Sequence, residues 1–144
     1  MSKVIVIICL LATSILSAQE WKTSLEEAKL EASKEAKNII LVFSGSDWCA
    51  PCIKLDKSIW QSEEFKNASD ENWILVKADF PKKKANALLE DQLKENNKLA
   101  EKYNPEGSFP KVVILNFEGK VVGIMGYEKI TPEQYVSKLK SFKN

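Results

Sequence analysis

The sequence predicts an α/β fold in which a central mixed β-sheet is flanked by helices on both faces. Residues 39–43 and 73–79 are apolar runs typical of buried strands, and the stretch between them contains helical spacing. Strands joined through a helix must pair in parallel. Residues 111–117 and 120–125 are separated only by a Glu-Gly pair, which indicates an antiparallel hairpin. A sheet with both kinds of pairing is mixed, and helices must cover its two faces.

The length and composition are those of one globular domain with few enzyme mechanisms open to it. The 144 residues suffice for a single core, and 44% of them are hydrophobic. The formal net charge is +1, every cation is a lysine, and the chain has no arginine and no histidine. Without arginine there is no bidentate reader of phosphates or bases, so no nucleic-acid partner is expected. Without histidine, Ser-His-Asp and Cys-His catalysis and histidine-ligated metal sites are excluded.

Residues 1–18 are predicted to be a secretory signal peptide, and residues 19–144 the mature domain. One lysine precedes an apolar block at residues 4–11, and Ala18 ends a pair of small residues suited to cleavage. This layout predicts an exported, periplasmic protein. The alternative is an uncleaved membrane anchor, although the apolar block is short for a membrane span. Cys9 follows a large residue rather than a small one, so it is not expected to be a lipoprotein acylation site.

Helices are predicted where apolar residues recur at helical spacing among charged ones. Residues 25–37 form the first, with Thr23 or Ser24 as its N-cap. Residues 88–103 form one long helix or two shorter ones. The last helix begins at Thr131, which is followed by proline and, two residues later, by glutamine, the pattern of a capping box.

Two connections are polar. Residues 61–72 are irregular in pattern, with a short helix expected around residues 62–67. Three consecutive lysines, Lys82, Lys83 and Lys84, follow the second buried strand. They are interpreted as a solvated loop in preference to a partner-docking patch.

Cys49 and Cys52 form a Cys-x-x-Cys pair between a buried strand and a helix. After removal of the leader they are the only cysteines, which in an exported protein indicates redox work. The polar turn at residues 44–47 precedes them, and Pro51 fits the first turn of the helix that follows. Free backbone N–H groups and the partial positive charge at a helix start favour Cys49 as a thiolate. The apolar face of this helix is predicted to contain Cys52, Leu55, Ile59 and Trp60.

Three segments resemble the thioredoxin superfamily. Residues 43–52 contain the sequence WCAPC, which is similar to the family's active site, and the preceding Gly-Ser-Asp resembles exported bacterial thioredoxin-like proteins. Residues 99–103 with 107–110 resemble the segment that ends in the family's cis-proline, and residues 117–120 resemble its last hairpin. The resemblance implies a thioredoxin fold in which Pro110 is cis and lies beside the disulfide.

The resemblance also implies how a substrate would bind. The backbone of Phe109 would pair with an incoming peptide, a small case of strand addition. Trp48 would shield the site and contact the partner, although simple packing over the turn is an equal alternative. The expected substrate-binding residues are Trp48, Ala50, Pro51, Phe109 and Pro110.

Two positions depart from the family pattern. Thioredoxins have a buried aspartate six residues before the first cysteine, where this chain has Phe43. Proton transfer must then use water or a nearby carboxylate, and Asp47 and Asp56 are the candidates. The second departure is Lys111, where the family usually has threonine after the cis-proline.

The predicted function is that of a thiol–disulfide oxidoreductase acting on protein disulfides in the cell envelope. Cys49, expected to be the more exposed of the two cysteines, is the nucleophile, and Cys52 is the resolving thiol. The pair Ala50-Pro51 resembles reducing members of the family, so a reductant supplied by a membrane-bound thiol donor is expected. No cofactor and no metal are expected, and the protein is expected to be a monomer.

Three alternatives remain open. The first is a disulfide oxidase or isomerase on the same fold. The second is a non-catalytic binding module or chaperone whose Cys49–Cys52 disulfide is structural. The third is a zinc site, which would need two further ligands from carboxylates or a second chain.

The other tryptophans are predicted to pack in the core, namely Trp21, Trp60 and Trp73.

Overall fold

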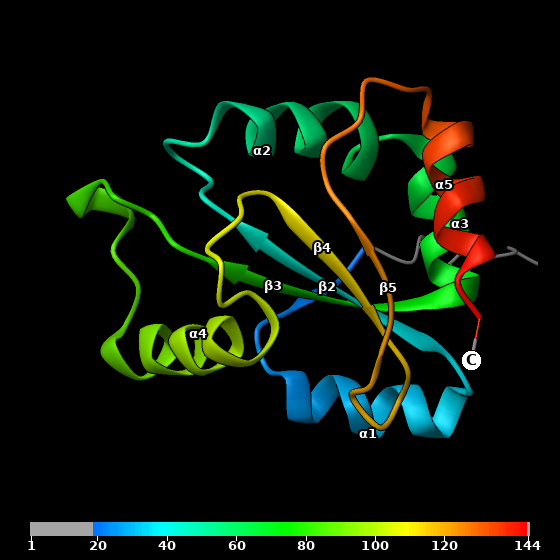
Figure 1. Cartoon of the computed structure of the whole chain (residues 1–144), viewed down its shortest axis with the longest axis horizontal. Coiled ribbons are helices and arrows are strands. Elements are labelled where there is room, and N and C mark those ends of the chain that lie inside the picture. Colours follow the sequence, from blue (N-terminus) through cyan, green and yellow to red (C-terminus); the bar gives the residue numbers. More distant parts are fainter. Residues whose placement is uncertain (1–18, 144) are drawn as a thin grey trace, which may run out of the picture.

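The computed structural model describes residues 19–143 and confirms a mixed sheet with helices on both faces (Figure 1). Five strands lie in the order β1-β3-β2-β4-β5; the first three are parallel, and β4 and β5 are antiparallel to their neighbours. The predicted signal peptide lies outside the described residues, among which no helix is long and apolar enough to cross a bilayer.

The strands are β1 (Trp21–Lys22), β2 (Asn38–Ser44), β3 (Trp73–Asp79), β4 (Lys111–Leu115) and β5 (Val121–Met125). The helices are α1 (Leu25–Glu35), α2 (Ala50–Leu55), α3 (Glu63–Asn72), α4 (Glu90–Tyr103) and α5 (Pro132–Ser141), with a π-helical turn η1 (Asp56–Trp60) after α2 and a 3-10 turn η2 (Lys84–Asn86) before α4.

Helices α2, α3 and α5 cover one face of the sheet, and α1 and α4 cover the other (Figure 1). Side chains alternate along the central strand β2, so it contributes to both layers. Ile40 and Val42 face the α2 side, whereas Ile39, Leu41 and Phe43 face the α1 side. All are at most 1% exposed, which explains why the strand is a continuous apolar run.

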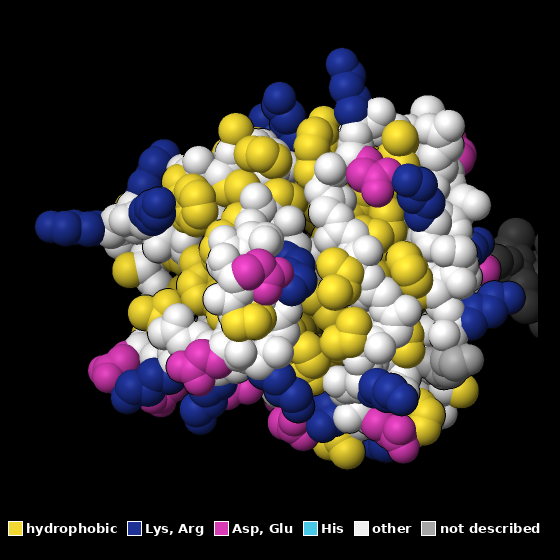
Figure 2. Space-filling view, in the orientation of Figure 1, with side chains coloured by type: hydrophobic (Ala, Val, Ile, Leu, Met, Phe, Trp, Pro, Cys, Tyr) yellow, Lys and Arg dark blue, Asp and Glu magenta, His cyan; other side chains and the backbone are white. Residues whose placement is uncertain are grey.

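Strands β2 and β3 are adjacent and parallel, so they end side by side at the same end of the sheet. Ser44 pairs with Asp79, and β4 places Lys111 opposite Phe43. The turn after β2, the loop after β3 and Pro110 before β4 therefore lie at the same end of the molecule. Figure 2 shows hydrophobic surface and projecting lysine side chains at this end.

The predicted helix starts are largely confirmed. The Ser24 hydroxyl accepts a hydrogen bond from Glu27 N at the start of α1, and Thr131 with Gln134 forms the capping box of α5. Helix α3 was expected to be shorter than it is. It extends to Asn72 because its buried side packs between β3 and α5, a tertiary contact that its mostly polar sequence did not reveal.

One expectation about the other elements was wrong, and one strand was not predicted. Helix α4 begins at Glu90, so Leu88 and Leu89 precede it, and Leu89 is 83% exposed instead of packed. Strand β1 was not predicted, because two residues are too few to show a period. Trp21 in this strand packs against Trp60, with ring centroids 5.5 Å apart. Trp60 and Trp73 are buried, so the predicted core roles of the three tryptophans are confirmed.

Candidate active site

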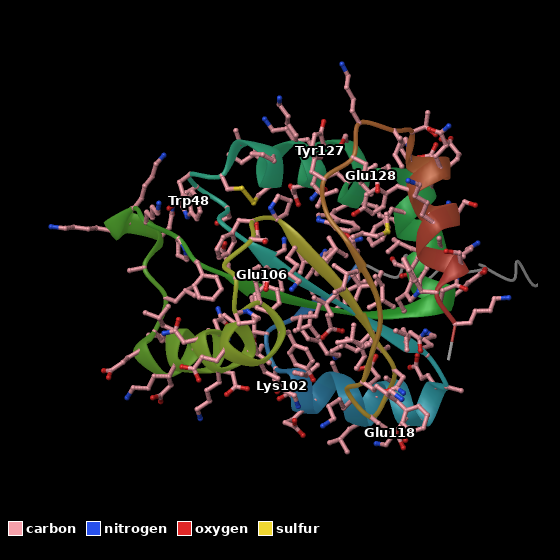
Figure 3. All side chains as sticks on the ribbon, viewed as in Figure 1. Trp48, Lys102, Glu106, Glu118, Tyr127 and Glu128 are labelled. Atoms are coloured by element: carbon pink, nitrogen blue, oxygen red, sulfur yellow. A yellow bond between two sulfur atoms is a disulfide. The ribbon has the colours of Figure 1, made fainter. Side chains whose placement is uncertain are left out.

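Cys49 and Cys52 are joined in a disulfide at the start of α2 (Figure 3). Cys49 is the N-cap of the helix, and its Sγ accepts a hydrogen bond from Cys52 N at 3.3 Å. An N–H directed at this sulfur favours a thiolate there once the disulfide is reduced. Cys49 was expected to be the more exposed of the two. In the disulfide the residues are 5% and 4% exposed, so both are buried almost equally.

The turn before Cys49 is fixed by hydrogen bonds within itself and to β3. Gly45 O accepts from Trp48 N at 3.2 Å and from Cys49 N at 2.9 Å. The carboxylate of Asp79, the last residue of β3, accepts from Ser46 N at 3.0 Å and from the Ser46 hydroxyl. The position of Cys49 is therefore set by both parallel strands.

The Asp47 carboxylate fastens the loop after β3 to the same turn. It accepts hydrogen bonds from Asn86 Nδ2 at 3.0 Å, Lys82 N at 2.9 Å and Lys83 N at 3.0 Å. The Asn86 side chain, followed by the Lys82 backbone, holds the pKa of Asp47 below its usual 3.8. Asp47 had been a candidate for moving the Cys52 proton, but its oxygens are engaged with the loop, which gives it a positioning role.

Trp48 covers the site from the side of this loop. Its indole Nε1 donates to Phe80 O at 2.7 Å, and its ring meets that of Phe109 edge-on with centroids 5.5 Å apart. Lys82 Nζ lies 3.8 Å from the ring centroid. Because a Cβ at position 45 would lie 2.3 Å from this ring, only glycine fits beneath it. Trp48 remains 39% exposed, so it can both pack and meet a partner.

The Phe109–Pro110 peptide bond is cis, as predicted. Pro110 ends the loop after α4, which is held by side-chain hydrogen bonds. The Asn104 side chain exchanges hydrogen bonds with Ser108 O and Ser108 N, both at 2.9 Å. Lys111, the unusual residue after this proline, is 8% exposed and pairs with Glu106. The hydrogen bond from Lys111 lowers the pKa of Glu106 below 4.5. Lys111 therefore connects the first residue of β4 to the loop that carries Pro110.

A cavity of about 160 Å³ lies behind Cys52, between α2 and the sheet. Its lining includes Cys52, Pro110, Val42, Ser44, Asp56 and Lys77. Lys77 Nζ lies 3.9 Å from Asp56 Oδ1, and these are the charged side chains of the lining. Asp56 follows Cys52 by one helical turn, so both face the same space. Of the two predicted carboxylates, Asp56 is the one placed near the resolving cysteine.

Phe43 does not face this cavity. It packs in the layer of α1 and α4, and the β2 side chains that line the cavity are Val42 and Ser44. Strand β2 therefore places no acidic side chain near Cys52, as expected. The β2 residues at that position are Val42 and Ser44, and not Phe43 as the sequence alignment had suggested.

The structure brings together Trp48, Cys49, Cys52, Phe109 and Pro110, while Ala50 and Pro51 are exposed at the start of α2. Sequence reasoning missed Asp79, Phe80, Ser44 and Lys77. A signal for Asp79 was present, since it ends a buried strand parallel to β2 and must lie at the same edge. Within residues 19–143, no group of three or more cysteine, aspartate or glutamate side chains is placed to share a metal ion.

Comparison with known proteins gives the same picture. The sequence model of the thioredoxin-like family matches residues 20–116. The chain is 40% identical over 122 residues to the disulfide bond reductase DsbH of Chlamydia pneumoniae, which covers 85% of this chain and 71% of that protein. It is 29% identical over 107 residues to the thioredoxin-related protein DsbJ of Chlamydia pneumoniae, covering 74% of this chain but 30% of DsbJ.

Solved structures agree with the sequence comparisons. A DsbH oxidoreductase superimposes with a TM-score of 0.80 at 38% identity, covering 87% of this chain and 84% of that one. The C-terminal domain of Neisseria meningitidis DsbD in the oxidised form has a TM-score of 0.56 at 17% identity, covering 88% of this chain and all of that one. The second likeness concerns the fold alone.

Proposed function

This chain belongs to the thioredoxin-like family and is a thiol–disulfide oxidoreductase, and we propose that it works as a reductase of protein disulfides in the cell envelope. The observation that carries the proposal is the Cys49–Cys52 pair, held at the start of α2 beside Pro110. The similarity to a relative named disulfide bond reductase supports the reducing direction. The predicted leader at residues 1–18 supports export, and cleavage after Ala18 belongs to the proposal.

In the reduced protein, the Cys49 thiolate attacks one sulfur of a substrate disulfide. This forms a mixed disulfide between Cys49 and the substrate and releases the other substrate sulfur as a thiolate. Cys52 loses its proton and attacks Cys49 Sγ, which restores the Cys49–Cys52 disulfide and releases the second substrate thiolate. Two electrons pass to the substrate in each turnover. A membrane-bound thiol donor returns them by the same exchange in reverse.

Substrate binding is assigned to the residues around the disulfide. The backbone of Phe109 would pair with an extended segment that carries the substrate cystine, and Pro110 keeps this edge next to Cys49 and Cys52. The Trp48 ring would pack against the same segment, since it is partly exposed and anchored through Nε1.

We assign the acceptor of the Cys52 proton to the cavity behind this cysteine. Asp56 accepts this proton directly or through a water, since it is the carboxylate of the lining. Lys77, 3.9 Å from Asp56, offers a positive charge that favours the Cys52 thiolate.

The direction of the reaction is tested by the reduction potential, measured by equilibration with glutathione buffers. A reductase should lie in the thioredoxin range, near about −270 mV, and a value near about −120 mV would contradict the proposal. A Cys52→Ala variant should trap mixed disulfides through Cys49, and Cys49→Ser with Cys52→Ala is its control. If Cys49→Ser left activity intact, the disulfide would be structural and the chain a binding module.

A further inference from the structure

The loop after β3 carries three cations that no part of the mechanism uses. We call residues 80–87 the lysine loop. Lys82, Lys83 and Lys84 are all exposed, and across residues 19–143 none of the three takes part in an ion pair. The loop itself contains no acidic residue.

The lysine loop is held against the active-site turn instead of moving freely in solvent. The Asp47 carboxylate takes three hydrogen bonds from it, and Phe80 O accepts the indole N–H of Trp48 at 2.7 Å. Lys82 Nζ then lies 3.8 Å from the Trp48 ring centroid. These contacts fix the loop backbone to the turn that precedes Cys49 and place Lys82 against the Trp48 ring.

Two carboxylates, Asp47 and Asp79, lie near the lysine loop and offset part of its positive charge, as the effect of Lys83 on Asp47 shows. Asp79 accepts hydrogen bonds from Ser46, and Asp47 from the loop backbone and Asn86. Their oxygens bond to the protein, whereas the three lysine side chains are exposed, with Lys82 lying beside the Trp48 ring. Dark blue side chains project from this end of the molecule next to yellow hydrophobic surface (Figure 2). An approaching molecule therefore meets aromatic surface and ammonium groups together.

We propose that the lysine loop and Trp48 form a docking surface for acidic residues that flank the disulfide of a protein substrate. This rests on the proposed reductase function. A substrate segment on the Phe109 backbone passes the Trp48 ring, and residues flanking its cystine reach Lys82, Lys83 and Lys84. Carboxylates there pair with the ammonium groups, and lysines there are repelled. Charges at the rim of an interface chiefly set the association rate and its salt dependence.

The test uses two synthetic peptides with the same disulfide, one flanked by glutamate and aspartate and the other by glutamine and asparagine. Single-turnover reduction by the pre-reduced protein is followed by acid quench, thiol alkylation and mass spectrometry. The second-order rate constant for the acidic peptide should exceed that for the amide peptide by about tenfold at low salt. The difference should shrink to less than about twofold at 1 M salt, where the screening length is about 3 Å.

The decisive variant is Lys82→Gln/Lys83→Gln/Lys84→Gln, which keeps every backbone N–H that Asp47 binds. It should lose the preference for the acidic peptide, so that its rate constants with the two peptides agree within about twofold at low salt. The matched control is Lys34→Gln/Lys140→Gln/Lys143→Gln, exposed lysines near the amino end of β2. The control has the same net charge and should keep the preference.

Three outcomes would overturn the docking surface: equal wild-type rates with both peptides, a preference that survives in the lysine-loop variant, or equal loss in the control. Binding to anionic vesicles that needs the lysine loop, with no peptide preference, would also overturn it and assign the loop to a membrane surface. Failure of wild type to reduce either peptide would instead contradict the proposed reductase function.

Discussion

Gly45 is the position at which one methyl group should disturb the active-site turn most directly. An ideal Cβ there would lie 2.3 Å from Trp48 Cε2 and 2.6 Å from Nε1, distances that real atoms do not adopt. The backbone cannot easily yield, because Gly45 O holds Trp48 N and Cys49 N. In Gly45→Ala the Trp48 ring must therefore move.

Movement of the ring would break three contacts. These are the hydrogen bond to Phe80 O at 2.7 Å, the edge contact with Phe109 at 5.5 Å and the contact with Lys82 at 3.8 Å. Their typical contributions are about 1 kcal/mol, about 0.5–1.5 kcal/mol and about 0.5–1 kcal/mol. We expect Gly45→Ala to lower the free energy of unfolding by about 2–3 kcal/mol, since these contributions do not add fully.

The measurement is urea denaturation of the oxidised protein, read by far-UV circular dichroism. A double-mutant cycle with Trp48→Ala separates ring displacement from any other effect, because in that background the new methyl group has no ring to meet. There Gly45→Ala should change the free energy of unfolding by less than about 1 kcal/mol in either direction. An equal loss in both backgrounds, or no loss in wild type, would refute the reasoning.

Two further predictions concern the carboxylates near the site. Hydrogen bonds lower the pKa of Asp47 in the folded state, so the stabilisation they give is complete above the unfolded pKa of about 4 and is lost as the pH falls through the folded value. Protection of the Lys82 and Lys83 amides, measured by NMR hydrogen exchange against intrinsic rates, should fall below about pH 4 in wild type and be low at every pH in Asp47→Ala. Asp56→Asn should slow resolution of the mixed disulfide by about tenfold to a hundredfold with the first attack unchanged, whereas Glu90→Gln, an exposed acid that pairs with Lys94, should change neither step. Equal slowing of both steps by Asp56→Asn would remove Asp56 from the proton path.

The parts of the site that could be predicted are those written in neighbouring residues. The Cys49–Cys52 pair and its place between strand and helix followed from local sequence, and the cis Phe109–Pro110 bond followed from the resemblance to the thioredoxin superfamily. The capping box at Thr131 followed in the same way. Each of these features depends on a few adjacent positions.

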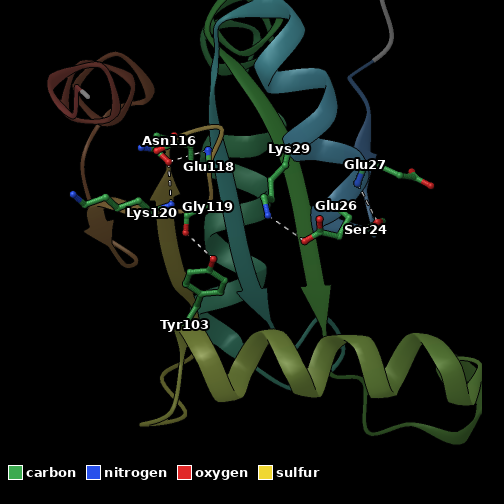
Figure 4. A network of polar contacts seen from close by, with 9 residues as sticks. All are labelled: Ser24, Glu26, Glu27, Lys29, Tyr103, Asn116, Glu118, Gly119 and Lys120. Carbon is green, nitrogen blue, oxygen red and sulfur yellow. Dashed lines mark hydrogen bonds and ion pairs between the residues drawn. The ribbon is translucent and has the colours of Figure 1, made fainter.

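The closing hairpin shows where local prediction stops. The Glu118-Gly119 turn was expected, and Gly119 has a φ of 86°, which favours glycine. Figure 4 shows what the sequence could not reveal: Tyr103 OH, at the end of α4, donates to Gly119 O at 2.7 Å. Asn116 Oδ1 also accepts from Glu118 N and Lys120 N, both at 3.0 Å. The contact from Tyr103 depends on how α4 packs on the sheet, which no local pattern encodes.

The same limit applies to the active site. Side chains of β2 point alternately to the two faces of the sheet, and this alternation determines which of them line the cavity behind Cys52. An alignment to the family without gaps placed Phe43 there, whereas the lining contains Val42 and Ser44. Lys77 lines it because β3 pairs with β2 in a register that puts Lys77 beside Val42. The sequence showed only that the lysine loop is polar. It could not show that Lys82 N and Lys83 N donate hydrogen bonds to Asp47, which lies about 35 positions earlier in the chain.

The residues proposed for substrate recognition and those proposed for proton transfer lie on opposite sides of the sheet. Phe80 and Phe109 pack against the layer of α1 and α4, and through them Trp48 and the lysine loop belong to that side of the sheet. Asp56 and Lys77 line the cavity on the α2 side. Because the disulfide lies between the two sets, substitutions in the lysine loop can change which substrates dock without altering the groups that take the proton from Cys52. Asp47 and Asp79 hold the turn and the loop in place through their hydrogen bonds, so Asp56 and Lys77 are the charged side chains that remain to act on Cys52 from the cavity behind it, as proposed above.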